Sequence, residues 1–244
     1  MADMYPVAGC RLFIGGVMSA SSADLEAEDF DGQTWLEIDG WTTMGQIGDA
    51  SALITQPMIN RGRDVKLKGT ANAGSMANMF AALDDDPGQI AFIAAAQPSN
   101  RSNYAFRMMM NDTPAEKSAT VTITVATPGV VTWTAHGLSV GDPVVFSTTG
   151  ALPTGLTAGT TYYVKTAPTA DTFTVAATPD GTAITTSSTQ SGVHTATTVP
   201  APSERLFIGL AMSAQEQGGD ANTGRMLNGT IEINSNIVKV GALG

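Results

Sequence analysis

The chain has 244 residues, of which 43% are hydrophobic, and this length allows one large domain or two small ones, each with its own core. Its formal net charge of −10 argues against a surface built to bind nucleic acid tightly, because such binding relies on Lys and Arg displacing counterions from phosphates. No run of eighteen apolar residues occurs, so no membrane-spanning helix is predicted, and the single cysteine excludes an intrachain disulfide.

Most of the hydrophobic pattern outside the middle of the chain has the period of β-strands. Val65 and Leu67 alternate with Lys66 and Lys68, as expected for a strand with one dry and one wet face. The strands predicted in this way are Arg11–Met18, Trp35–Asp39, Val65–Lys68, Gln89–Ala96, Tyr104–Met110, Leu206–Ser213 and Leu227–Asn234.

One segment has the period of a helix instead. Met76, Met79, Phe80 and Leu83 are spaced i, i+3, i+4 and i+7, which places them on one face of a helix. The acidic segment Asp84–Gly88 is expected to end this helix, because it contains a proline and places like charges at the helix C-terminus. The pattern predicts a short amphipathic helix that covers a sheet.

Composition changes sharply near Lys117 and again near Pro200. Thr recurs every few positions between them, and only four residues there are charged, namely Asp142, Lys165, Asp171 and Asp180. This predicts a discontinuous core domain, 1–117 and 201–244, interrupted by a Thr-rich all-β surface domain, 118–200. Regular short strands separated by turn signals such as Thr127-Pro128-Gly129 favour a β-sandwich for the inserted domain.

The two flanks of the insertion share a short sequence. Arg11-Leu12-Phe13-Ile14-Gly15 is followed by Met18-Ser19-Ala20, and Arg205-Leu206-Phe207-Ile208-Gly209 is followed by Met212-Ser213-Ala214. Such an echo arises either from a duplication or from two strands with similar roles in one sheet, and the sequence does not separate these origins. Either origin places both flanks in one domain.

The sequence offers no support for catalysis. His136 and His194 have no cysteine or acidic cluster at ligand spacing, and neither a nucleophile elbow nor a phosphate-binding glycine loop occurs. The acidic runs 24–31 and 84–86 lack the ligand order of a calcium-binding loop, so solvated loops are the better interpretation. We therefore expect no enzyme activity, no catalytic residue, no metal site and no cofactor.

The flanks nevertheless resemble a known family, the major tail tube proteins of siphophages and of related gene transfer particles. The resemblance lies in the order and character of several segments and covers about two thirds of the chain, without the insertion. The segments are Gly9–Gly15, Trp35–Ile38, Gly45–Asp49, Arg61–Thr70, Ala73–Met76, Leu206–Ser213 and Met226–Asn234.

This resemblance implies a mainly β chain: a tail-tube β-sandwich or barrel-forming domain with one short flanking α-helix, plus the inserted all-β domain. It also implies hexameric rings that stack into the tail tube, the channel for DNA passage into the host. The implied partners are further copies of the chain, the tape measure protein, the tail terminator and baseplate or distal tail proteins. The implied location is the virion tail, which is assembled in the host cytoplasm. No membrane is implied as a partner.

The resemblance also suggests which residues serve the tube. An acidic channel wall would repel phosphate and let DNA slide. The candidate lumen-facing acids are Glu37, Asp39 and Glu232, and the alternative is that they face outward. The segment from Trp41 to Ile59 is expected to form a long loop that reaches the neighbouring ring, with candidates Trp41, Thr42, Gly45, Gly48, Asp49 and Ile59.

Two other functions stay open. A carbohydrate- or cell-surface-binding module is suggested by the aromatic residues of the insertion, Trp133, Tyr162 and Tyr163, which either stack on sugars or fill a small core. A baseplate or terminator component built on the same fold would form a single ring without polymerising.

Overall fold

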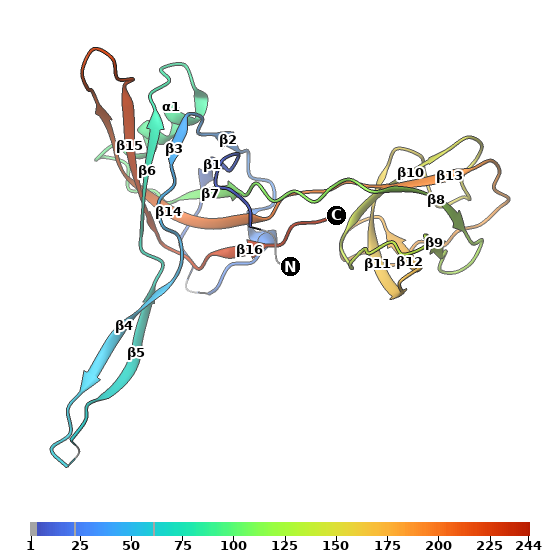
Figure 1. The fold of residues 1–244 in the computed structure, drawn as a ribbon, viewed down its shortest axis with the longest axis horizontal. Coiled ribbons are helices and arrows are strands. Elements are labelled where there is room, and N and C mark those ends of the chain that lie inside the picture. The colour runs from blue at the N-terminus through green and yellow to red at the C-terminus, as the bar shows by residue number, and fades with distance from the viewer. Residues whose placement is uncertain (1–3, 22, 61) are drawn as a thin grey trace. The chain divides into compact units, whose positions relative to one another are not determined.

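The computed structural model describes residues 4–21, 23–60 and 62–244, so Arg61, which belongs to one of the compared segments, lies outside it. The chain forms two compact units (Figure 1). Unit 1 contains the chain up to Asn111 together with Glu204–Val240, and unit 2 contains Asp112–Ser203 together with Gly241–Gly244. Strands dominate both units, and the described residues form one α-helix, so the expected mainly β class is confirmed.

Unit 1 is built on an open eight-stranded sheet. Seven strands follow the spatial order β2-β1-β7-β14-β15-β6-β3, and β16 pairs with one end of β14. All these strand pairings are antiparallel. The strands are β1 (Arg11–Val17), β2 (Leu36–Glu37), β3 (Trp41–Thr43), β6 (Ser75–Ala81), β7 (Tyr104–Met109), β14 (Glu204–Gln217), β15 (Met226–Ile233) and β16 (Val238–Val240).

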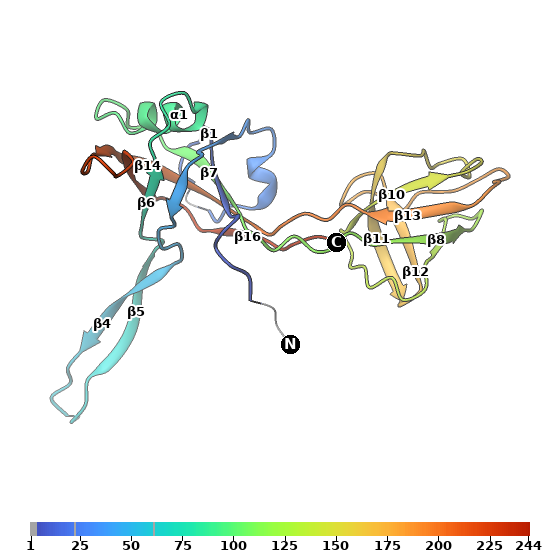
Figure 2. The ribbon, with the colours of Figure 1, turned by 45° about the horizontal axis from the view of Figure 1, so that its top comes forward.

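The α-helix covers one face of this sheet. Helix α1 (Pro87–Ala95) lies across the strands in Figure 2 and contributes Phe92 to the core, where it contacts Phe80 and Phe106 at ring-centroid distances of 6.1 and 6.5 Å. Gly88 allows the close approach, because a Cβ there would lie 1.8 Å from the carbonyl oxygen of Glu37. The opposite face is partly covered around Phe30 by the 3₁₀ helix η1 (Ala27–Phe30), and β16 contributes Val238 and Val240 to the same cluster.

The predicted helix over Met76–Leu83 is wrong, and so is the predicted strand over Gln89–Ala96. Met76 and Phe80 are both buried, but they lie on one face of strand β6, because a spacing of four residues fits both a helix and a strand. Pairing with β15 and β3, which are distant in sequence, decides for the strand. The following acidic segment starts the helix and does not end one: Asp86 is its N-cap, accepting a hydrogen bond from the amide of Gln89, and Pro87 occupies its first turn.

The two copies of the repeated pentapeptide lie on either side of strand β7. Leu12 pairs with Met108 on one side, and Arg205 pairs with Met108 on the other. The two copies are therefore offset by one residue and present opposite faces: Leu12 is buried beneath α1, whereas Leu206 is buried on the other face of the sheet. They occupy similar places in one sheet without playing equivalent packing roles.

A separate two-stranded sheet completes unit 1. Strands β4 (Ala50–Gln56) and β5 (Val65–Asn72) form a long antiparallel hairpin, the β4–β5 hairpin (Figure 1). Every residue of β4 is exposed, and of β5 only Val65 and Gly69 are half-buried.

Unit 2 is a closed barrel and not the predicted sandwich. Its strands follow the order β10-β11-β12-β9-β8-β13, and β13 closes the ring by pairing with β10. Closure leaves no sheet edge, and the interior is filled by Trp133, Phe146 and Phe173, among others. The strands are β8 (Ser118–Ile123), β9 (Val131–Thr132), β10 (Pro143–Thr148), β11 (Thr161–Thr169), β12 (Thr172–Ala176) and β13 (His194–Thr198).

The close packing of α1 against β2 can be tested at Gly88. The change Gly88→Ala is expected to lower the free energy of unfolding by about 1–3 kcal/mol, because the new Cβ overlaps backbone that cannot move without disturbing β2. Urea denaturation measures this effect. Gly224→Ala is the control, since a Cβ there meets nothing within 4 Å. Equal stability of both variants would contradict the close packing of α1 against β2.

Candidate assembly surfaces

The longest strand of unit 1 has an open edge. On one side, β14 pairs with β7 only from Glu204 to Gly209, while its other side continues along β15 to Gln217. Within the described ranges, no strand occupies the β7 side of residues 210–217. A cavity of about 260 Å³ runs beside this edge, between Met212–Gln215 and the end of α1. Unpaired edges of this kind are templates for pairing with another chain.

One face of the sheet is polar and partly uncovered. The pairing register places Glu232 opposite Leu210 and Ser75, on the face away from α1. We call this region the polar sheet face and define it as Ser75, Ala77, Ser213, Gln215, Asn228, Thr230 and Glu232, all exposed or half-buried. The half-buried Leu210 and Met79 lie on the same side of the sheet, paired with Glu232 and Asn228. It contains one acidic residue and neither Lys nor Arg.

The three acids predicted to face the lumen do not form one cluster. Glu37 pairs with Phe13 at the β2 edge of the sheet, on the same face as Glu232 but with β1, β7 and β14 between them. Its carboxylate forms a salt bridge with Arg11, and this hydrogen-bonded carboxylate raises the pKa of the Arg11 guanidinium. Asp39 is exposed just beyond β2. Glu37 is thus partly neutralised, and the lumen assignment of all three stays a prediction.

The segment predicted as one long loop, from Trp41 to Ile59, contains two strands. Trp41 and Thr42 belong to β3. Gly45 lies tightly against β6, where a Cβ would be 2.6 Å from the backbone of Ala77. The chain between Gly45 and β4 contains Gly48, at φ +146°, and the exposed Asp49. Ile59 lies at the turn of the β4–β5 hairpin and is fully exposed. The part that extends is therefore this hairpin, and an inter-ring role for these residues stays a prediction.

Asn78 fastens the first part of that segment to the sheet. Its side chain is 2% exposed, and its Oδ1 accepts hydrogen bonds from the Trp41 indole and the Gly45 amide, both at 3.1 Å. Its Nδ2 donates to the carbonyl of Met76 at 3.2 Å. A buried amide with satisfied partners holds the chain that enters the hairpin.

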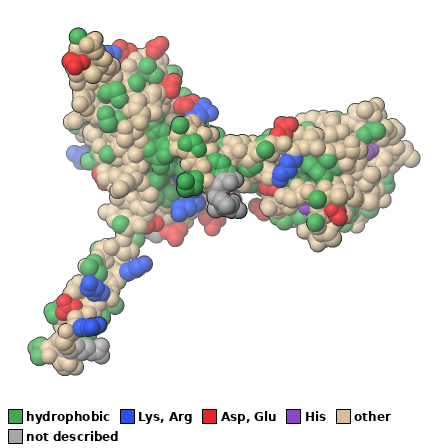
Figure 3. Space-filling view, viewed as in Figure 1, with side chains coloured by type: hydrophobic (Ala, Val, Ile, Leu, Met, Phe, Trp, Pro, Cys, Tyr) green, Lys and Arg blue, Asp and Glu red, His purple; other side chains and the backbone are tan. Residues whose placement is uncertain are grey.

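Sequence reasoning missed the basic character of the hairpin as an assembly feature. Arg63, Lys66 and Lys68 are exposed on it, and Figure 3 shows Lys and Arg side chains beside hydrophobic ones along its length. The alternation from Val65 to Lys68 was a sufficient signal for the strand. It could not show that both faces stay uncovered.

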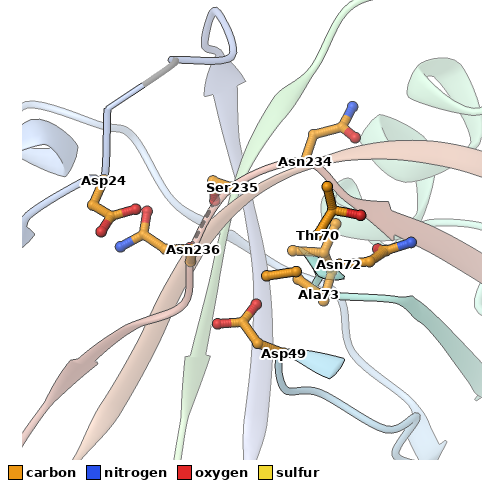
Figure 4. A pocket seen from close by; sticks show the side chains of 10 residues that line it. Asp24, Asp49, Thr70, Asn72, Ala73, Asn234, Ser235 and Asn236 are labelled. Atoms are coloured by element: carbon orange, nitrogen blue, oxygen red, sulfur yellow. Dashed lines mark hydrogen bonds between the residues drawn. The ribbon is translucent and has the colours of Figure 1, made fainter. Parts of the chain in front are cut away.

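A polar cavity of about 530 Å³ lies at the root of the hairpin. We call it the root cavity. Figure 4 shows Asp24 and Asn236 pointing toward each other, with Asp49 at another part of the lining. Asn236 is fixed by two hydrogen bonds to the backbone of Leu25. Among the described residues, the carboxylates of Asp24 and Asp49 take part in no side-chain hydrogen bond or salt bridge.

The polar and aromatic residues singled out in unit 2 are largely structural. His136 accepts a hydrogen bond from the amide of Leu138 and pairs with the carbonyl of Thr169, while His194 bonds to Thr148 and Gln190. Trp133 and Tyr162 are only 6% and 5% exposed. These two aromatic rings fill the barrel and cannot offer the sugar-stacking surface considered for them.

The described residues show neither a metal-binding cluster nor a helix long and apolar enough to cross a membrane. Searches against protein-family models and against curated proteins found no match to the chain.

The role of Asn78 can be tested directly. Asn78→Leu is expected to cost about 1–3 kcal/mol of stability, because it leaves the half-buried Trp41 and Gly45 donors without their acceptor. Chemical denaturation followed by tryptophan fluorescence measures the loss. Asn228→Leu, at a half-buried position on the adjacent strand, is the control and should change stability much less. Similar losses in both variants would argue against this special role.

Proposed function

We propose that this chain is the major tail tube protein of a long-tailed bacteriophage or phage-like particle. The observation that carries the proposal is the open edge of β14 in a sheet that does not close on itself. An edge of eight residues beside a groove lined by both polar and apolar side chains is suited to pairing with a strand of another copy. Repeating this contact around a ring, six copies in the family that the flanks resemble, removes the free edges and creates a barrel.

The polar sheet face would line the channel of that barrel. DNA passing through would meet mostly hydroxyl and amide groups and the carboxylate of Glu232, together with apolar side chains such as Leu210 and Met79. No Lys or Arg of the polar sheet face would hold phosphate. Glu37 and Asp39 would add negative charge near the β2 edge, although Arg11 offsets that of Glu37. Transit of DNA would therefore be non-specific, with no cofactor or catalytic step.

The β4–β5 hairpin would join rings into a tube. Its exposure along both strands suits a contact that forms only on assembly. The tape measure protein would set the length, and terminator and baseplate proteins would bound the ends. Unit 2, a closed barrel without free edges, would decorate the outside of the virion tail.

Electron microscopy of the purified protein, before and after concentration, tests this function. Tubes of uniform width with an axial hole are expected. Single rings that never stack would favour a baseplate or terminator component, and monomers at every concentration would overturn the proposal. Glycan binding by such monomers would favour the cell-surface-binding module.

A deletion of residues 113–202 tests the outward placement of unit 2. Asp112 and Ser203 are natural points to rejoin, because the Ser203 amide donates to the Asp112 carboxylate at 2.7 Å, so two glycines can bridge them. The deletion removes no residue of the two clusters that form the core of unit 1. Tubes of smaller diameter with an unchanged hole are expected. An unchanged outer diameter, or a lost hole, would contradict this placement.

A further inference from the structure

The β4–β5 hairpin has two chemically different faces. Residues opposite each other in an antiparallel pair share a face, and the register pairs Thr55 with Lys66 and Ile54 with Leu67. Lys66 and Lys68 therefore lie on one face, while Ile54 and Leu67 lie on the other. The basic face also carries Leu53, which pairs with Lys68 and is 67% exposed. Ile54 is 48% exposed and Leu67 is 56% exposed, so the apolar face is as uncovered as the basic one.

Such a hairpin needs a partner. A two-stranded sheet is at best marginally stable in water, and this one buries almost none of its side chains. None of the three salt bridges among the described residues involves Arg63, Lys66 or Lys68. Its apolar face favours a protein as the occupant, because a nucleic acid would engage the basic face alone.

The distribution of charge indicates that the protein that docks on the hairpin is another copy of this chain. Residues 50–72 contain four Lys or Arg and one Asp, although the whole chain carries −10. Residues 24–31 contain five acidic residues and no basic one. Of this acidic segment, Asp24 lines the root cavity together with Asp49, and both carboxylates are exposed and unpaired among the described side chains.

We propose that the basic face of the hairpin of one copy docks on the root cavity of the next, with Lys66 and Lys68 facing Asp24 and Asp49. This inference rests on the proposed tube function and names the contact that stacks the rings. The donor surface and the acceptor surface are different parts of the chain, so the contact is heterologous and repeats along an axis. The apolar face is then left to be covered by the same neighbouring ring.

Two complementary double variants test the contact in the full-length protein. Lys66→Glu with Lys68→Glu makes the hairpin acidic, and Asp24→Lys with Asp49→Lys makes the root cavity basic. Each variant alone places like charges together, so ring–ring association should weaken by about tenfold or more, while the rings themselves remain. An equal mixture should recover tubes, because each altered surface then meets its complement. A folding defect would not be rescued by mixing.

Sedimentation velocity and electron microscopy provide the readouts. The controls Lys239→Glu and Asp180→Lys reverse exposed charges elsewhere and should form tubes like the parent. Tubes from either double variant alone, at the parent's concentration, would overturn this contact and leave the tube function standing. Loss of tubes without recovery on mixing would also overturn it. Failure of the parent to form rings or tubes would overturn both proposals, and a loss of DNA binding with unchanged tubes would assign the lysines to nucleic acid.

Discussion

The ladder between β7 and β14 is the interaction on which unit 1 depends, because it joins the chain before the insertion to the chain after it. Six residue pairs, from Tyr104–Gly209 to Met109–Glu204, span a separation of about a hundred residues. Phe106 and Phe207 stack across it at 5.5 Å, and Phe92 of α1 packs edge-on against Phe106. The same strand β7 binds β1 on its other side. Among the described strands, this ladder alone connects the two halves of the sheet, β2-β1-β7 and β14-β15-β6-β3.

The length mismatch within this ladder gives unit 1 its unfinished edge. Strand β14 has fourteen residues and β7 has six, so β7 satisfies less than half of one side of β14. Unit 2 shows the opposite solution, since six strands close on themselves around Phe146 and Phe173. The two units therefore differ in what they still require. The barrel has a complete set of strand partners, whereas part of β14 has an open edge that another chain could pair with.

The sequence predicts the strands well and the single helix badly, for a reason visible in particular residues. Val65 to Lys68 and Leu227 to Ile233 alternate strictly, and both are strands. Met76 and Phe80 fit both periods, and only their pairing with β15, about 150 residues away, resolves the ambiguity. Asp86 and Pro87 are compatible with both the end and the beginning of a helix. The hydrogen bond from the Gln89 amide to the Asp86 carboxylate identifies the beginning. The local sequence pattern contains no information about these long-range contacts.

The candidate surfaces were predictable to a similar, limited degree. The acidic residues and the segment after Trp41 were identifiable from character and order, but their grouping depends on register. Glu37 and Glu232 share a face only because four ladders fix the strands between them, and Arg11 meets Glu37 only through the β1–β2 pair. The hairpin shows the same limit more sharply. Its alternation is typical of a half-buried strand, yet neither face is covered within one copy, so the pattern describes a contact that a single chain does not contain. In the proposed tube, the hairpin would bury its apolar side chains only on docking, so free subunits would associate weakly until a template ring supplied the complementary surface.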